Sequence, residues 1–292
     1  MKKLLLLLCI LLFLSACSGP EPYGNGAETF RELRNIELSV LADSSLSDVL
    51  PDIMERYRES NPGVRLRVQF APSGALAAQI REGAPCDLFL SASPEAMSGL
   101  DDSGYLLQDS RVDLLENRLV LAVPEGNPRG IRNFTHMAAL IRQNGALFAA
   151  ANAGDTLGAY TQTLFESCSL NKAELSQSVT YAPDAKETVT RVRSLMADGG
   201  IVYRTDADML SVVDTADEKA LYSVAVLSGS QRPLAAAGLA EYLSGAEAEE
   251  LFTRAGFDPV SEPQEAAPAV PYWEAMTPEE GFTEDPAAVD GY

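Results

Sequence analysis

Residues 36–46 read Ile-Glu-Leu-Ser-Val-Leu-Ala-Asp-Ser-Ser-Leu, an apolar run of strand length that passes into three polar residues. Two further apolar runs of strand length follow at 66–70 and 87–92, and amphipathic stretches long enough for helices separate the runs. Alternation of this kind is typical of βαβ units, in which helices cover a mostly parallel sheet. The sequence therefore predicts an α/β fold.

The first of these helices is predicted from a one-sided apolar pattern. Its apolar face consists of Leu46, Val49, Leu50, Ile53 and Tyr57. Pro51 removes one backbone donor a turn into this pattern, so we expect the regular helix to begin near Asp48 or to be bent at its start.

The N-terminus carries an export signal. Lys2 and Lys3 precede an apolar run at 4–13 that is too short to span a bilayer as a permanent helix. Leu14-Ser15-Ala16-Cys17 resembles the lipobox of bacterial lipoproteins, which implies a signal peptide at 1–16 and lipid attachment at Cys17; a secretory signal that is cut elsewhere is the alternative. We expect a flexible tether at 17–34 and an extracytoplasmic protein, lipid-anchored to the outer face of the cell membrane or periplasmic.

Charge excludes several partners. The chain has 42 Asp and Glu against 22 Lys and Arg, a formal net charge of −20. Such a surface repels nucleic acid and anionic lipid headgroups, so membrane attachment must come from the lipid. It also repels small anions at long range, and capture of an anion would have to rely on fixed dipoles at short range.

Two lobes are predicted from the length and from two β-prone runs, 119–123 and 222–226, that flank a central segment with its own strands and helices. We expect these runs to cross between the lobes. The predicted units are lobe I at 35–120 plus 225–258, lobe II at 121–224, and an acidic Pro-rich tail at 259–292 that is disordered or docks through its aromatic residues.

Four cysteines are present. Cys9 would leave with the signal peptide and Cys17 would be acylated. Because Cys86 and Cys168 fall in different predicted lobes, we expect two buried thiols rather than a bridge.

Three strands each pass into a small polar residue that opens a helix, at 40–46, 70–76 and 148–160. We expect the polar side chains to act as N-caps and the free N–H groups of each first turn to point the same way. Helix N-termini bind anions through unpaired donors and the helix dipole. A cap alone is also what any α/β protein uses, and Ser93-Pro94-Glu95 is interpreted as a plain cap.

The stretch 36–257 resembles the molybdate-binding proteins of ABC transporters. The matching segments are Ala42-Asp43-Ser44-Ser45-Leu46, Phe70 to Ile80, Gly83 to Ala92, Gly200 to Ala207, Tyr242-Leu243 and Ala255-Gly256-Phe257. The resemblance implies a two-lobed periplasmic-binding-protein-like fold of type II, in which each lobe is a mixed, mostly parallel sheet flanked by helices and two crossing strands form the hinge. It also implies a monomer that serves an ABC permease and ATPase, with molybdate or tungstate as ligand and no cofactor.

The resemblance further implies which residues hold the anion. Ser45 and Ser73 match serines that give hydroxyl and backbone N–H, Leu157 and Ala185 match backbone donors, and Tyr203 matches a tyrosine whose hydroxyl reaches the ligand. The sequence departs from the family at Thr156-Leu157-Gly158, where proline and then a small residue are frequent, so Thr156 is an alternative donor. The metal centre would be bound only as its oxyanion, without direct metal ligands.

Other readings remain open. An enzyme is disfavoured because the only histidine, His136, has no serine motif around it, and scattered cysteines give no metal-ligand spacing. A sulfate-binding protein, a binding protein for a carboxylate or polar organic solute, or a ligand-sensing lipoprotein are the alternatives. Arg204 is predicted to be structural because neighbours on a strand point to opposite faces, so it should point away from the side that Tyr203 faces.

Overall fold

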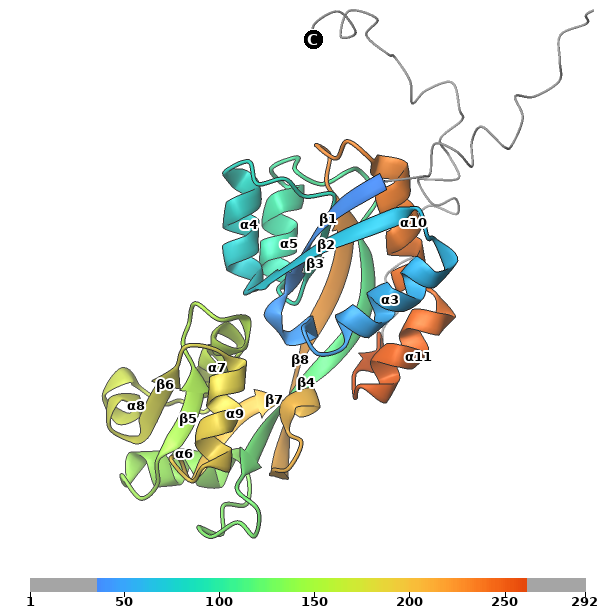
Figure 1. Cartoon of the computed structure of the whole chain (residues 1–292). Coiled ribbons are helices and arrows are strands. Elements are labelled where there is room, and N and C mark those ends of the chain that lie inside the picture. Colours follow the sequence, from blue (N-terminus) through green and yellow to red (C-terminus); the bar gives the residue numbers. More distant parts are fainter. Residues whose placement is uncertain (1–35, 262–292) are drawn as a thin grey trace, which may run out of the picture.

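One mixed β-sheet runs through residues 36–261, the part of the chain that this computed structural model describes. Its strands lie in the order β2-β1-β3-β8-β4-β7-β5-β6, and the short β9 pairs with β4. The pairs of β1 with β2 and β3, and of β5 with β6 and β7, are parallel. The long strands β4 and β8 are antiparallel to each other. Strand β4 is also antiparallel to β7, and β8 to β3. Figure 1 shows two groups of elements joined by β4 and β8, which confirms the predicted two-lobed α/β fold.

Lobe I, as named from here on, contains β1, β2 and β3 with helices on both faces of the sheet. Alternate side chains of β1 face opposite layers, because successive residues of a strand point to opposite sides. Leu41 packs with α4 and α5, whereas Val40 packs with α3 and α10. Burial on both faces explains the continuous apolar runs of β1 and β3, whereas β2, at the edge of the sheet, alternates with exposed residues. The elements are β1 (Ile36–Asp43), the 3-10 turn η1 (Ser44–Leu46), α3 (Leu50–Ser60), β2 (Val64–Ala71), α4 (Ser73–Arg81), β3 (Leu88–Ser91), α5 (Pro94–Asp101), α10 (Pro233–Leu243), α11 (Ala246–Arg254) and β9 (Asp258–Pro259).

Lobe II contains β5, β6 and β7 with their helices. The first turn of α7 packs directly on the loop after β5. A side chain at Gly158 would place its Cβ 1.7 Å from the carbonyl oxygen of Asn152. Only glycine allows this approach, which fixes the N-terminus of α7 against the sheet. The elements are α6 (Phe134–Arg142), β5 (Phe148–Ala151), α7 (Thr156–Ser167), α8 (Lys172–Ser178), β6 (Val179–Ala182), α9 (Ala185–Arg193), β7 (Gly199–Tyr203) and the 3-10 turn η2 (Arg204–Asp206).

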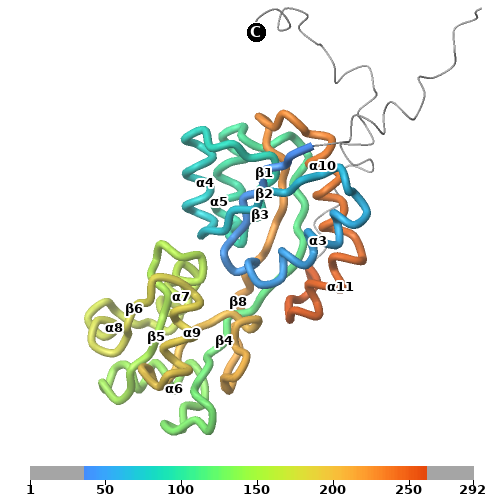
Figure 2. The backbone as a smooth tube through the Cα atoms, viewed as in Figure 1, coloured from blue at the N-terminus to red at the C-terminus, as the bar shows by residue number. Residues whose placement is uncertain are grey.

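Strands β4 (Val112–Val123) and β8 (Ser211–Val226) connect the lobes. In Figure 2 they are the green and orange tubes that run from one lobe to the other. Both contain the runs that were predicted to cross, and their pairing shifts register three times, which bends the ribbon. The residue limits of the lobes stay a prediction.

The first helix differs from its prediction. Regular helix begins at Leu50, after the separate 3-10 turn, with Pro51 in its first turn, where a missing N–H leaves no hydrogen bond unmade. The predicted apolar face is buried throughout.

Cys86 and Cys168 are free thiols, as predicted, but both are half-buried rather than fully buried. The predicted tail starts too early, because Pro259 pairs with β4 and the hydroxyl of Ser261 donates to Glu116 Oε1 at 2.9 Å. The signal peptide, Cys17, the tether and the rest of the tail lie outside the described residues. Within residues 36–261, no helix is long and apolar enough to cross a membrane.

Candidate functional site

The buried carboxyl group of Asp43, at the end of β1, is the centre of a cluster of hydrogen-bond donors. Its side chain is completely buried. The backbone N–H of Ser45 donates to Oδ1 at 3.0 Å and the hydroxyl of Ser45 donates to the same oxygen at 2.7 Å. Because this serine has only one proton, the hydroxyl of Tyr222, 2.8 Å away, donates to Ser45 Oγ.

The other carboxyl oxygen of Asp43 is held by both lobes. Ser73 donates to Oδ2 through its backbone N–H at 3.0 Å and its hydroxyl at 2.5 Å, and Thr156 of lobe II donates its hydroxyl at 2.6 Å. The N–H of Ser73 also lies 3.0 Å from Thr156 Oγ1, and Ser73 Oγ accepts from the N–H of Ala92 at 2.9 Å. Five donors from three segments therefore converge on one carboxyl group, and we name these residues, Asp43, Ser45, Ser73 and Thr156, the Asp43 cluster.

Two of the three predicted N-caps are confirmed and one is wrong. Asp43 caps the 3-10 turn and Asp155 caps α7. Ser73 is instead the first residue of α4, after Pro72, and its hydroxyl turns to Asp43 instead of to its own helix. Ser93 caps α5 as a plain cap, as predicted.

The structure brings the two predicted lobe I serines, Ser45 and Ser73, into the Asp43 cluster. Among the predicted lobe II donors, Leu157 gives its N–H to Asp155 Oδ1 at 2.9 Å, so the helix cap uses it. Ala185 is the buried first residue of α9, where a backbone N–H has no partner within the helix. Neither residue hydrogen bonds to the cluster, whereas Thr156, the alternative donor, does.

Tyr203, at the end of β7, has an unpaired hydroxyl. Its side chain is 1 % exposed, and the hydroxyl has no hydrogen-bond partner among residues 36–261. Burial, and then the nearby Tyr222 and Asp43, raise the pKa of Tyr203 well above its ordinary value, so the hydroxyl remains a neutral donor. A buried donor without an acceptor is unfavourable by itself, which makes this hydroxyl a candidate donor to a ligand.

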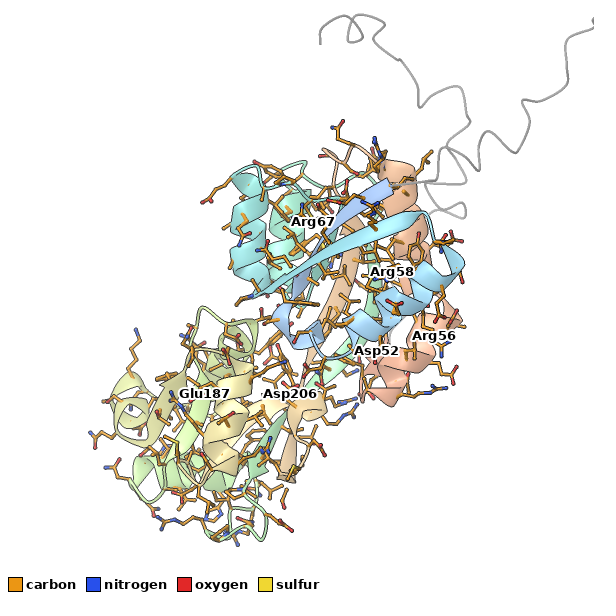
Figure 3. All side chains as sticks on the ribbon, in the orientation of Figure 1. Asp52, Arg56, Arg58, Arg67, Glu187 and Asp206 are labelled. Carbon is orange, nitrogen blue, oxygen red and sulfur yellow. The ribbon has the colours of Figure 1, made fainter. Side chains whose placement is uncertain are left out.

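The surroundings of the cluster are acidic. Burial raises the pKa of Asp155 to about 6, and the charge of Asp43 adds to this rise. Burial and then Asp48 raise the pKa of Asp206 to about 6, while Lys186 lowers it. Figure 3 shows Asp206 where the lobes meet, whereas Arg58 and Arg67 lie on lobe I away from it. The groups that donate to Asp43 are hydroxyls and backbone N–H groups, all of them neutral.

A cavity of about 180 Å³ borders the Asp43 cluster at Thr156. Both lobes line it, with Gly74 from lobe I and Thr156 from lobe II next to the cluster. Its walls also carry the acids Glu95, Asp155 and Glu218. A larger cavity of about 440 Å³ lies within lobe II and is not lined by residues of the cluster.

Other chemistry has little support in the described residues. Residues 36–261 contain no group of three or more His, Cys, Asp or Glu that could hold a metal ion. Burial raises the pKa of the Cys86 thiol to about 12, so it is not a thiolate nucleophile. Arg204 donates to the carbonyl of Gly256 at 2.6 Å and to Asp258 at 2.8 Å, which confirms its predicted structural role.

Sequence reasoning missed the central position of Asp43. It was considered only as a cap, although an acid followed by two serines at the carboxyl end of a parallel strand is a local signal for a site. Its contact with Thr156 spans 113 residues of sequence and had no local signal.

A two-lobed α/β fold with a donor cluster between its lobes defines a solute-binding protein. Residues 38–258 match the family of bacterial extracellular solute-binding proteins, and the chain belongs to that family. The molybdate-binding protein ModA of Escherichia coli is 31% identical over 232 residues, which cover 76% of this chain and 88% of ModA.

Solved structures agree with this assignment. A Clostridium difficile chain, assigned as the substrate-binding domain of a molybdenum ABC transporter, is 30% identical with a TM-score of 0.62, and the match covers 77% of this chain and all of that one. The sulfate-binding protein SubI of Mycobacterium tuberculosis has a TM-score of 0.65 at 16% identity, and the match covers 78% of this chain and 88% of SubI, which shows the fold alone.

One relative is named as an enzyme, the aconitate isomerase of a Pseudomonas species, 26% identical over 240 residues that cover 76% of this chain and 88% of that protein. The ModA relative and the two structural neighbours above are named as binding proteins or as a substrate-binding domain.

Proposed function

We propose that this protein is the binding component of an ABC importer and captures a tetrahedral oxyanion, molybdate or tungstate, between its lobes. The observation that carries the proposal is the convergence of five neutral donors on an oxygen-bearing group at the Asp43 cluster. The names of its relatives, including the molybdate-binding protein of Escherichia coli, support this choice of ligand.

Neutral donors suit a fully deprotonated oxyanion. Such an ion offers only acceptors, and it loses much hydration free energy in a buried site. Each charge-assisted hydrogen bond contributes roughly 1.5–3 kcal/mol, so a shell of such bonds offsets this loss. Serine and threonine hydroxyls and backbone N–H groups supply these bonds without bringing a counter-charge.

Lobe II would complete the shell. Tyr203 has a buried hydroxyl that lacks an acceptor, and Ala185 offers an N–H at the start of α9. Leu157 could join only if its N–H left Asp155, so Thr156 is the stronger candidate at the start of α7. Closure of the lobes about β4 and β8 would then give the transporter a distinct loaded shape to recognise.

The remaining parts of the proposal concern the cell. The protein would be a monomer without enzymatic activity, held at the outer face of the membrane by lipid on Cys17, and it would deliver its ligand to a permease and ATPase pair. A ligand-sensing lipoprotein would have the same site, and growth of a deletion strain at limiting molybdate separates import from sensing.

Calorimetric titration tests the ligand. The chain that starts after Cys17 is titrated with molybdate, tungstate, sulfate and phosphate, together with Ser45→Ala and Ser73→Ala. We expect molybdate and tungstate to bind tightly, sulfate weakly, and both variants to bind more weakly. If none of the four ions binds, the oxyanion assignment is wrong and the family membership shows only the fold and class.

A further inference from the structure

The donors of the candidate site are already used by a group of the protein itself. Both oxygens of Asp43 accept hydrogen bonds, from Ser45 on one side and from Ser73 and Thr156 on the other. Its side chain is completely buried and makes no salt bridge among the described residues. An internal carboxyl group therefore stands in the position of an anionic ligand.

An external oxyanion cannot share this arrangement. The proton of each hydroxyl in the cluster is committed to Asp43, and a second anion at the same donors would lie within a few ångströms of the carboxylate. Two like charges at such a distance repel strongly in a buried site. Binding of an oxyanion to these donors therefore requires the Asp43 side chain to leave them.

We propose that Asp43 is an internal competing ligand that sets the affinity and anion selectivity of the site and couples the two lobes. This inference rests on the proposed function for its oxyanion, but the coupling of the lobes does not depend on it. The carboxylate joins the end of β1 to the start of α7 through Thr156, and this is a buried bond between the lobes.

Other hydrogen bonds also join the lobes and do not involve Asp43. The N–H of Ser73 lies 3.0 Å from Thr156 Oγ1, and Arg204 of η2 donates to the carbonyl of Gly256 and to Asp258. The hydroxyl of Tyr160 donates to the carbonyl of Ala92 at 2.9 Å, and Lys186 pairs with Asp48 at 2.6 Å on the exposed surface. The exposed pair is weak in water and screened by salt. Loss of the Asp43 bond should therefore loosen the lobes without separating them completely.

The competitor also selects between ligands. A monocarboxylate offers two oxygens and one charge, the same as Asp43, so it has no advantage over the internal group. A tetrahedral dianion offers four oxygens, and the additional ones can accept from further donors such as the unpaired hydroxyl of Tyr203. Asp43 therefore lowers the affinity of these donors for every anion, and only anions with more acceptor oxygens or more charge than a carboxylate bind despite this competition.

The test compares Asp43→Ala with Thr156→Val and with the control Asp101→Ala. The control removes one acidic charge from the exposed end of α5, far from the cluster in sequence. Without oxyanion, small-angle X-ray scattering should give a larger radius of gyration for Asp43→Ala and Thr156→Val than for the parent and the control. Thr156→Val keeps Asp43 and the lobe I donors, so it tests the coupling even if Asp43→Ala folds poorly.

Chemical rescue of stability gives a second readout that needs no molybdate. Acetate or formate at high concentration should raise the melting temperature of Asp43→Ala, relative to chloride at equal ionic strength, because a small carboxylate can replace the deleted side chain. The parent, the control and Thr156→Val should show no such rise. Absence of rescue together with an unchanged radius of gyration would overturn the proposal.

Oxyanion titration completes the experiment. Asp43→Ala should bind molybdate at least about tenfold more tightly than the parent, which corresponds to about 1.4 kcal/mol. If the parent binds molybdate and Asp43→Ala binds it no more tightly, competition is wrong while the proposed function stands. If neither binds any oxyanion but acetate rescues the variant, the proposed function fails and the internal ligand stands.

Discussion

Substitution of Tyr203 by phenylalanine should change stability and binding in opposite directions. The substitution removes only a hydroxyl, which is buried and has no partner among the described residues. Tyr222 provides a matched control: it is equally buried, and its hydroxyl donates to Ser45 Oγ at 2.8 Å. The two variants therefore delete the same group from an unpaired and a paired position.

The magnitudes follow from the hydrogen bonds made and unmade. An unpaired buried hydroxyl costs about 1 kcal/mol or more, so Tyr203→Phe should raise the free energy of unfolding by about 1 kcal/mol. For a folded part of this size, that corresponds to a rise in melting temperature of about 2–4 °C. Tyr222→Phe should lower the free energy of unfolding by about 1 kcal/mol, because a buried bond is lost.

Binding should respond the other way. If the hydroxyl of Tyr203 donates to a bound oxyanion, its loss removes a charge-assisted bond of about 1.5–3 kcal/mol and weakens binding by roughly 10- to 150-fold. Thermal unfolding without ligand and calorimetric titration with molybdate measure the two effects on the same samples. A Tyr203→Phe protein that melts lower than the parent and binds molybdate equally well would refute the reasoning, since the tyrosine would then be an ordinary core residue.

Three further substitutions test the remaining assignments. Ser73→Ala should lower the free energy of unfolding by about 1–3 kcal/mol, because Asp43 loses a donor and the N–H of Ala92 loses its acceptor. Urea unfolding measures this free energy, and an unchanged midpoint would contradict the hydrogen-bond network. In the folded state the pKa of Asp155 is raised to about 6, above its ordinary value of 3.8. The protonated Asp155 therefore stabilises the fold at low pH, and this contribution is lost as the pH rises through about 4 to 6. Asp155→Asn, which retains the cap, should flatten this loss in urea unfolding at pH 4, 5 and 7; an unaltered pH profile would show that another acid is responsible. Arg204→Gln should reduce stability by about 1 kcal/mol or less while the dissociation constant for molybdate stays within about twofold, and a large loss of binding would make this arginine a ligand.

The local structure was largely predictable from the sequence. Strand β1 was expected at 36–42 and is found at Ile36–Asp43, because a continuous apolar run suits a strand that is buried on both faces. The predicted apolar face of the first helix is buried throughout, although regular helix begins only at Leu50, so that Leu46 lies in the 3-10 turn before it. Chain length and two β-prone runs predicted the two lobes, and the family resemblance, which depends on ordered local motifs, supplied the fold type and the candidate residues.

The arrangement of the donors was decided only by the tertiary structure. A polar residue after a strand reads as a helix cap, and Ser73 shows why that reading fails: the parallel pairing of β1 with β2 brings its hydroxyl to Asp43, 30 residues away, which offers a charged acceptor in place of the helix. The same long-range packing brings Thr156 to the same carboxyl group and leaves Tyr203 unpaired beside a paired Tyr222. Sequence patterns specify the periodicity and the ends of single elements, because these depend on near neighbours. Which polar groups meet depends on how β4 and β8 join the two lobes, and that follows from the packing of the whole chain.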